Sequence, residues 1–126
     1  MKTCYLIEDD IDDQDLFRMA LDGIDKTIKC DVANNGYDAV QQLNTKPDYT
    51  PDYIFMDVNM PKMNGIDCLK HLRKLSRLNG TPIIMVSTSE EPQIIAQCKQ
   101  LGANDFVVKP ASLDSLTSIL SKIINP

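Results

Sequence analysis

The chain alternates between short apolar runs and longer stretches in which apolar residues recur every three or four positions. The short runs, which predict strands, are residues 3–7, 28–33, 53–57, 82–87 and 105–108. Four of these runs are continuously apolar, which is typical of parallel strands in a sheet that is covered on both faces. Lys29 and Asp31 interrupt the run at 28–33, which indicates a half-exposed edge strand.

A stretch with helical periodicity follows each predicted strand. The apolar positions of these stretches are Leu16, Phe17, Ala20, Leu21 and Ile24; Ala39, Val40 and Leu43; Ile66, Leu69, Leu72 and Leu75; Ile94, Ile95, Cys98 and Leu101; and Leu113, Leu116, Leu120 and Ile123. Asp12 or Asp13 is expected to cap the first helix, and Ser112 the last. The third helix is expected to start near Asn64, and Gly102 to end the fourth. This alternation predicts an α/β fold, with a parallel sheet between two layers of helices.

Composition narrows the class of protein. The chain has 126 residues, 43% hydrophobic and 25% charged, which fits one globular domain with no linker or second domain. Its four cysteines contain no C-x-x-C pair, and no apolar run could span a membrane, so we expect free thiols and a cytoplasmic setting. The net charge of −5 argues against direct nucleic-acid binding, because no basic stripe could neutralise phosphates.

Polar side chains gather where the predicted strands end. These residues are Glu8, Asp9 and Asp10 after the first strand, Asp57 at the end of the third, Ser87 and Thr88 at the end of the fourth, and Lys109 and Pro110 after the fifth. In an open α/β sheet, the carboxyl ends of the strands form the functional edge. We therefore expect carboxylates, hydroxyls and one lysine to share a single site.

This combination of groups suits phosphoryl transfer to a carboxylate. Crowded carboxylates repel one another, and a hard divalent cation such as Mg²⁺, which prefers oxygen ligands, would relieve that repulsion. A lysine and a hydroxyl could hold the oxygens of an anionic group. Metal and lysine together would spread the charge of a transferring phosphoryl group.

The same residues, in this order and spacing, resemble a response-regulator receiver domain over the whole chain. The motifs are Glu8-Asp9, "MDVNMPKMNG" around Asp57, Ser87, and "GANDFVV" followed by Lys109-Pro110. The resemblance implies a doubly wound, five-stranded parallel sheet with five helices and the flavodoxin-like strand order 2-1-3-4-5. It also implies one receiver domain over residues 1–126, without an output domain, that acts as a stand-alone response regulator.

The resemblance implies a role for each acidic position. Asp57 matches the phosphoacceptor, which takes a phosphoryl group from the phosphohistidine of a histidine kinase or a histidine phosphotransfer protein. Asp9 matches the direct Mg²⁺ ligand, Glu8 its acidic neighbour, and Asn59 the residue whose backbone carbonyl completes the metal site together with Asp57. Glu8 replaces the more common aspartate, which is a frequent variant.

The remaining motif residues match the part of the family that responds to phosphorylation. Ser87 matches the hydroxyl that moves to the phosphoryl group, Lys109 the lysine that holds a phosphoryl oxygen, and Phe106 the aromatic side chain that rotates with the switch. Phe106 lacks the hydroxyl of the more common tyrosine, and Thr88 replaces a smaller residue, which could narrow access to the phosphoryl group. Pro110 matches a proline that usually follows a cis peptide bond.

The resemblance also implies how the protein works with others. Rather than an enzyme with an external substrate, it would be a phosphoacceptor that assists its own phosphorylation and dephosphorylation. Its partners would be a kinase or phosphotransfer protein and a downstream protein, with no direct nucleic-acid contact and no membrane insertion. It would be a monomer or a weak, phosphorylation-dependent dimer.

Plainer interpretations apply to the other polar residues. Asp10 could be a solvated loop charge, and the acids at 12, 13 and 15 could be first-turn charges that favour the helix dipole. His71 lies within the third predicted helix, where an exposed position is expected. Docking of a kinase beside the first helix stays open, because the family uses that face.

Three other classes of protein share parts of this pattern. An aspartyl-phosphate phosphatase would need an aspartate where Asn59 stands. A flavodoxin-like electron carrier would need a glycine- and hydroxyl-rich loop after the first strand, where acids would repel the flavin phosphate. A degenerate receiver used only for docking would be expected to lack part of the site.

Overall fold

Five strands alternate with five helices in the computed structural model, which describes residues 2–126. The strands are β1 (Thr3–Ile7), β2 (Lys29–Ala33), β3 (Tyr53–Asp57), β4 (Ile83–Ser87) and β5 (Asp105–Val108). The helices are α1 (Ile11–Ile24), α2 (Gly36–Thr45), α3 (Gly65–Leu72), α4 (Pro92–Gln100) and α5 (Leu113–Ile124), with a short 3₁₀ turn at Ser76–Leu78. Every predicted strand and helix is therefore present, with bounds that differ by a few residues.

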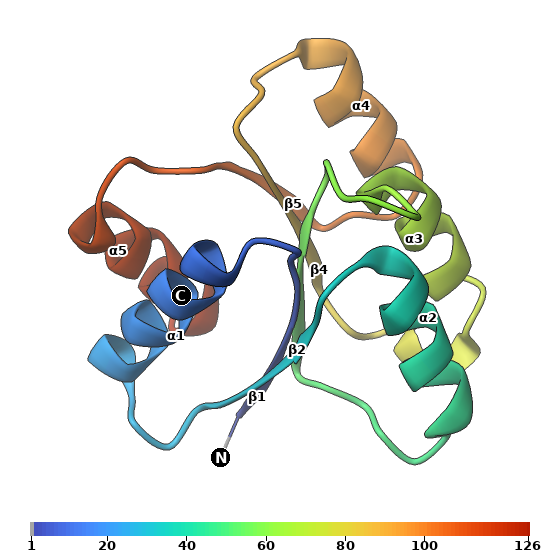
Figure 1. Ribbon diagram of the computed structural model, residues 1–126, viewed down its shortest axis with the longest axis horizontal. Coiled ribbons are helices and arrows are strands. Elements are labelled where there is room, and N and C mark those ends of the chain that lie inside the picture. Colours follow the sequence, from blue (N-terminus) through green and yellow to red (C-terminus); the bar gives the residue numbers. More distant parts are fainter. Residues whose placement is uncertain (1) are drawn as a thin grey trace.

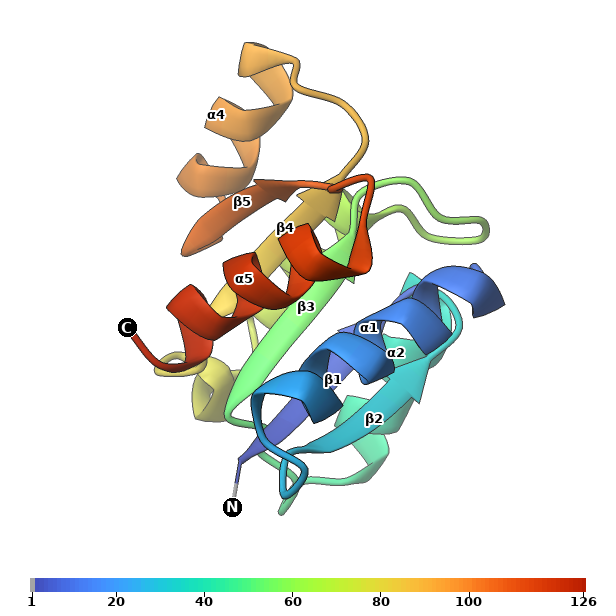
Figure 2. The same ribbon diagram turned by 90° about the vertical axis from the view of Figure 1, so that its left-hand side faces the viewer.

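The strands form one sheet in the order β2-β1-β3-β4-β5, and each neighbouring pair is parallel. This confirms the predicted fold class and strand order. Figure 1 shows α1 and α5 on one face of the sheet and α2, α3 and α4 on the other. Figure 2 looks onto the first of these faces, with α1 and α5 in front of the strands.

Helices cover both faces of the sheet, which explains why the strands have no polar side. Side chains alternate between faces along a strand. In β1, Tyr5 and Ile7 pack in the core under α2, α3 and α4, whereas Cys4 and Leu6 pack in the core under α1 and α5. At the predicted edge strand β2, Lys29 is exposed. Burial on both faces therefore produces the continuous apolar runs of the sequence.

The helix ends follow local capping rules, with one correction. Ser112 caps α5 as predicted, and Asn64, near which α3 was predicted to start, is the cap of α3; each accepts a hydrogen bond from the backbone N–H of the third residue after it. The cap of α1 is Asp10, which accepts a hydrogen bond from the backbone N–H of Asp13 at 3.0 Å, so the prediction of Asp12 or Asp13 was wrong. The cap must precede the first helical residue, and α1 starts at Ile11, earlier than its apolar stripe indicates.

Two other helix ends show how packing and periodicity differ. The apolar spacing of α3 continues to Leu75, but the helix ends at Leu72. Leu75 still packs against the core from the turn that follows, which explains the extended pattern. Gly102 ends the α4 region as predicted, with a left-handed backbone (φ +108°) that glycine adopts without steric cost.

All four cysteines are free, as expected, and Cys4, Cys68 and Cys98 are buried. Burial raises the pKa of the Cys68 thiol to about 12, so this side chain is a packing group rather than a nucleophile. Within residues 2–126, no helix has the length and apolar character needed to cross a bilayer.

Candidate functional site

The site lies at the edge of the sheet where the carboxyl ends of β1, β3, β4 and β5 meet. Glu8 directly follows β1, Asp57 is the last residue of β3, Ser87 is the last residue of β4, and Lys109 directly follows β5. The parallel register aligns these ends, because Asp57 pairs with Val86 of β4. The strand order therefore brings together residues that are up to 101 positions apart in the sequence.

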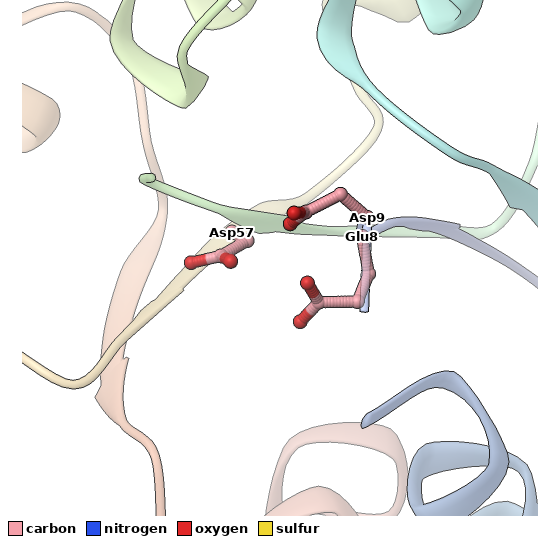
Figure 3. Close-up of side chains that lie close together, drawn as sticks. All are labelled: Glu8, Asp9 and Asp57. Carbon is pink, nitrogen blue, oxygen red and sulfur yellow. The ribbon is translucent and has the colours of Figure 1, made fainter. Parts of the chain in front are cut away.

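Three carboxylates form the acidic part of the site. Glu8, Asp9 and Asp57 each offer an oxygen, and these oxygens lie within 4.8 Å of one another. Figure 3 shows the three side chains gathered beside the ends of β1 and β3. Glu8 and Asp57 are buried and Asp9 is exposed, so two carboxylates of the cluster lie in the protein interior and the third is accessible to solvent. Oxygen ligands at this spacing fit a hard divalent cation.

Lys109 supplies the positive charge of the site. Its Nζ lies 2.9 Å from Glu8 Oε1, 2.9 Å from Asp13 Oδ2 and 3.4 Å from Asp57 Oδ2. The lysine side chain is 20% exposed, so these contacts are only partly screened by water. One ammonium group therefore faces three carboxylates, which leaves an excess of negative charge.

Burial and neighbouring charges shift the pKa values of Glu8 and Lys109. Burial is the main reason why the pKa of Glu8 rises from 4.5 to about 7, and the nearby charge of Asp57 raises it further, against the opposing effect of Lys109. Burial also disfavours the charge on Lys109, but its hydrogen bonds with Glu8 and Asp13 outweigh burial and raise its pKa above the ordinary value. A cation among the carboxylates would favour the ionised form of Glu8.

The loop after β3 folds back onto the end of its own strand. The N–H of Gly65 donates to the carbonyl oxygen of Val58 at 2.8 Å. A Cβ atom at Gly65 would lie 2.3 Å from the carbonyl oxygen of Asp57, so only glycine fits this approach. In the same loop the N–H of Asn59 donates to Asp57 Oδ1 at 3.3 Å. The turn in "MDVNMPKMNG" thus holds Asp57 at the edge of the sheet.

The predicted switch residues occupy the neighbouring strands. Ser87 is fully buried, and its Oγ accepts a hydrogen bond from the N–H of Ser89 at 3.1 Å. Thr88, by contrast, is exposed. Phe106 is half-buried, pairs in register with Met85, and packs against the core under α2, α3 and α4.

The prediction of a cis bond before Pro110 is wrong for this structure, because no peptide bond among residues 2–126 is cis. The trans form of a bond before proline is favoured by about 0.5–1 kcal/mol. The N–H of Lys109 donates to the carbonyl oxygen of Ser87 at 2.7 Å, so β-type pairing continues as far as the residue before Pro110.

The structure adds two residues that the sequence analysis did not assign to the site. Asp13 in the first turn of α1 contacts Lys109, and Gln14 Nε2 donates to the backbone oxygen of Glu8 at 2.7 Å. Asp13 also remains a first-turn charge, as interpreted from the sequence. The contact between Asp13 and Lys109 was not predicted because the two residues are 96 positions apart in the sequence. The start of α1 directly follows the end of β1, however, so its first turn lies at the same edge of the sheet as Lys109. Asp12, Asp15 and His71 are exposed.

Comparison with known proteins agrees with this site. Residues 4–121 match the family model of the response regulator receiver domain, so the chain belongs to that family. It is a CheY-like receiver of two-component signalling, and its acidic pocket is typical of the phosphoacceptor site of such domains.

Individual relatives show how far the similarity extends. The chain is 33% identical to the chemotaxis protein CheY of Bacillus subtilis over 93 residues, which are 74% of this chain and 73% of CheY. It is 37% identical to the regulatory protein AtoC of Escherichia coli over 92 residues, which are 73% of this chain but only 19% of AtoC. The match likewise covers 29% of the Escherichia coli regulator of RpoS, so the chain spans a minor part of these two longer relatives.

Solved structures give the same result. The phosphorylated cyanobacterial phytochrome response regulator RcpA superposes with a TM-score of 0.88 and 27% sequence identity, over 97% of this chain and 90% of RcpA. CheY4 of Vibrio cholerae superposes with a TM-score of 0.83 and 28% identity, over 98% of both chains.

Proposed function

We propose that Asp57 accepts a phosphoryl group from the phosphohistidine of a histidine kinase or a histidine phosphotransfer protein, and that this modification changes the affinity of the chain for other proteins. The single observation that carries the proposal is the position of the Asp57 carboxylate at the end of β3, within reach of both Lys109 and the other two acids. RcpA, at 27% identity, is a phosphorylated relative.

In the proposed transfer, Asp57 is the nucleophile and Lys109 interacts with the phosphoryl oxygens. An oxygen of Asp57 attacks phosphorus and forms a new P–O bond while the P–N bond to the donor histidine breaks. The histidine nitrogen keeps the electron pair and takes up a proton. Lys109, already 3.4 Å from Asp57 Oδ2, is placed to neutralise charge on the phosphoryl oxygens.

The acidic cluster fits Mg²⁺, because it presents hard oxygen donors in a partly open, partly buried group. Glu8, Asp9, Asp57 and the backbone carbonyl of Asn59 would hold the ion. When bound, Mg²⁺ would neutralise the acids and polarise the phosphoryl oxygens.

The proposed output uses the strands beside Asp57. A phosphorylated Asp57 would offer new acceptor oxygens to the Ser87 hydroxyl, which now accepts from the N–H of Ser89. Movement of Ser87 would change the end of β4, where the chain leads to α4, and the packing of Phe106 on β5. These changes would favour one of two surfaces for a downstream protein.

The test is labelling by a small phosphodonor such as acetyl phosphate, with intact-mass spectrometry as the readout. We expect one added phosphoryl group that requires Mg²⁺ and is absent in Asp57→Asn. Asp48→Asn is the matched control, because it removes the same charge from an exposed residue outside the site.

Three outcomes would contradict the proposal: labelling that persists in Asp57→Asn, labelling that needs no divalent cation, and no labelling at all. Multiple turnover of a phosphomonoester would instead indicate a phosphatase. If the labelling requires both Mg²⁺ and Asp57, phosphotransfer from purified histidine kinases of the source organism would identify the natural donor.

A further inference from the structure

Asp13 is an additional carboxylate on Lys109 that the proposed transfer does not require. It reaches the site from the first turn of α1 and lies 2.9 Å from Nζ, closer than Asp57 at 3.4 Å. An ammonium group has three donors, and Glu8, Asp13 and Asp57 occupy all three. Lys109 therefore has no free donor for a new anion.

The three acids differ in how easily they could release the lysine. The side chains of Glu8 and Asp57 are 5% and 9% exposed, whereas that of Asp13 is 43% exposed. A buried carboxylate that loses its partner either stays charged at a desolvation penalty or binds a proton, whereas a half-exposed one is rehydrated. The contact with Asp13 is thus the one that Lys109 can break at the lowest free-energy cost.

We propose that Asp13 is a positioning residue that competes with the phosphoryl group for Lys109. This inference rests on the proposed phosphorylation of Asp57. The phosphoryl group carries about −1.5 to −2 charges and three acceptor oxygens in place of the single charge of the Asp57 carboxylate, and these oxygens draw a donor away from Asp13. Asp13 therefore weakens the hold of the site on a phosphoryl group. Its ion pair joins α1 to the end of β5 in the unphosphorylated state and breaks in the phosphorylated one.

The test measures the affinity of the whole chain for beryllium fluoride, a phosphoryl mimic, by NMR titration in excess Mg²⁺. Asp13→Asn should bind about fivefold more tightly than wild type, because a partly exposed ion pair is worth about this factor. Asp12→Asn is the matched control: it removes the same charge from an exposed neighbour on the same helical turn. Asp13→Glu, which retains the charge, should restore most of the wild-type affinity.

A double-mutant cycle separates competition from general electrostatics. In a Lys109→Met background, Asp13→Asn should change the affinity no more than Asp12→Asn does. Equal effects of the two substitutions in the wild-type background would overturn the competition while leaving the proposed function intact. Failure of the wild-type chain to bind beryllium fluoride would instead count against the proposed function itself.

Discussion

Arg73 and Lys109 are both partly buried cations, but they have opposite kinds of partner. Arg73, just after α3, donates to the carbonyl oxygens of Gly102, Leu78 and Thr81 at 2.9, 2.7 and 3.0 Å, and to Asn104 Oδ1 at 2.8 Å. All of these acceptors are neutral. Lys109, in contrast, faces three carboxylates.

The difference indicates a structural role for Arg73 and agrees with the binding role proposed for Lys109. The planar guanidinium of Arg73 matches several fixed acceptors at once and ties α3 to the segments that lead into β4 and β5. Lys109 is a compact charge whose partners carry more negative charge than it can neutralise. A site with excess negative charge is poised to take up a cation, whereas the Arg73 cluster is complete.

The largest expected effect is on stability, at Arg73. Arg73→Ala should lower the free energy of unfolding by about 3 kcal/mol, because three partly buried carbonyl oxygens lose a charged donor. Urea denaturation measures this, and Lys74→Ala, at an exposed neighbouring position, should have almost no effect. Arg73→Lys should recover only part of the loss. If Arg73→Ala is as stable as the wild type, the comparison with Lys109 fails.

A smaller effect is expected from the pH dependence of Glu8. Its folded-state pKa, raised to about 7 from 4.5, means that the folded protein binds the proton more tightly than the unfolded chain. Its contribution to stability is complete below pH 4.5 and is lost as the pH rises to about 7. Without divalent cations, wild type should lose about 2 kcal/mol over this window relative to Glu8→Gln.

Denaturation curves at pH 5 and pH 8 check this prediction. Excess Mg²⁺ should remove most of the difference between Glu8→Gln and wild type at pH 8, because a cation favours the ionised acid. A difference between the two proteins that does not change with pH would contradict the assignment of the shift to Glu8.

The smallest effect on stability is expected at Lys109 itself. Lys109→Met should cost only about 1 kcal/mol near pH 6, because Glu8 can bind a proton when its cationic partner is lost. Labelling by acetyl phosphate should nevertheless fall strongly. Denaturation and labelling of the same sample separate the two effects, and a loss of stability as large as that of Arg73→Ala would make Lys109 a structural residue as well.

The sequence was most informative where side-chain burial repeats with a simple period. The apolar runs predicted every strand, and the runs of β1, β3 and β4 are continuous because these strands are covered on both faces. The polar residues at the strand ends predicted the acidic cluster and Lys109, because a parallel sheet gathers the carboxyl ends of its strands at one edge.

Local rules failed where another interaction decided the outcome. The cap of α1 lies at Asp10 because the helix begins before its apolar stripe does. The bond before Pro110 is trans in this structure, and no local feature of the sequence chooses between the two isomers of such a bond. Nothing in the sequence singled out Arg73, because its acceptors lie in two separate segments of the chain, at Leu78 and Thr81 and at Gly102 and Asn104.

The sequence by itself determined the order of strands and helices, the parallel sheet and the group of residues at its edge, since these depend on periodic burial and on the end of each strand. Only the tertiary structure decided which carboxylates contact Lys109 and how deeply each is buried. These features depend on the packing of α1 beside the end of β5, which joins Asp13 to a lysine 96 residues away. The charge balance of the site is therefore a property of the folded chain.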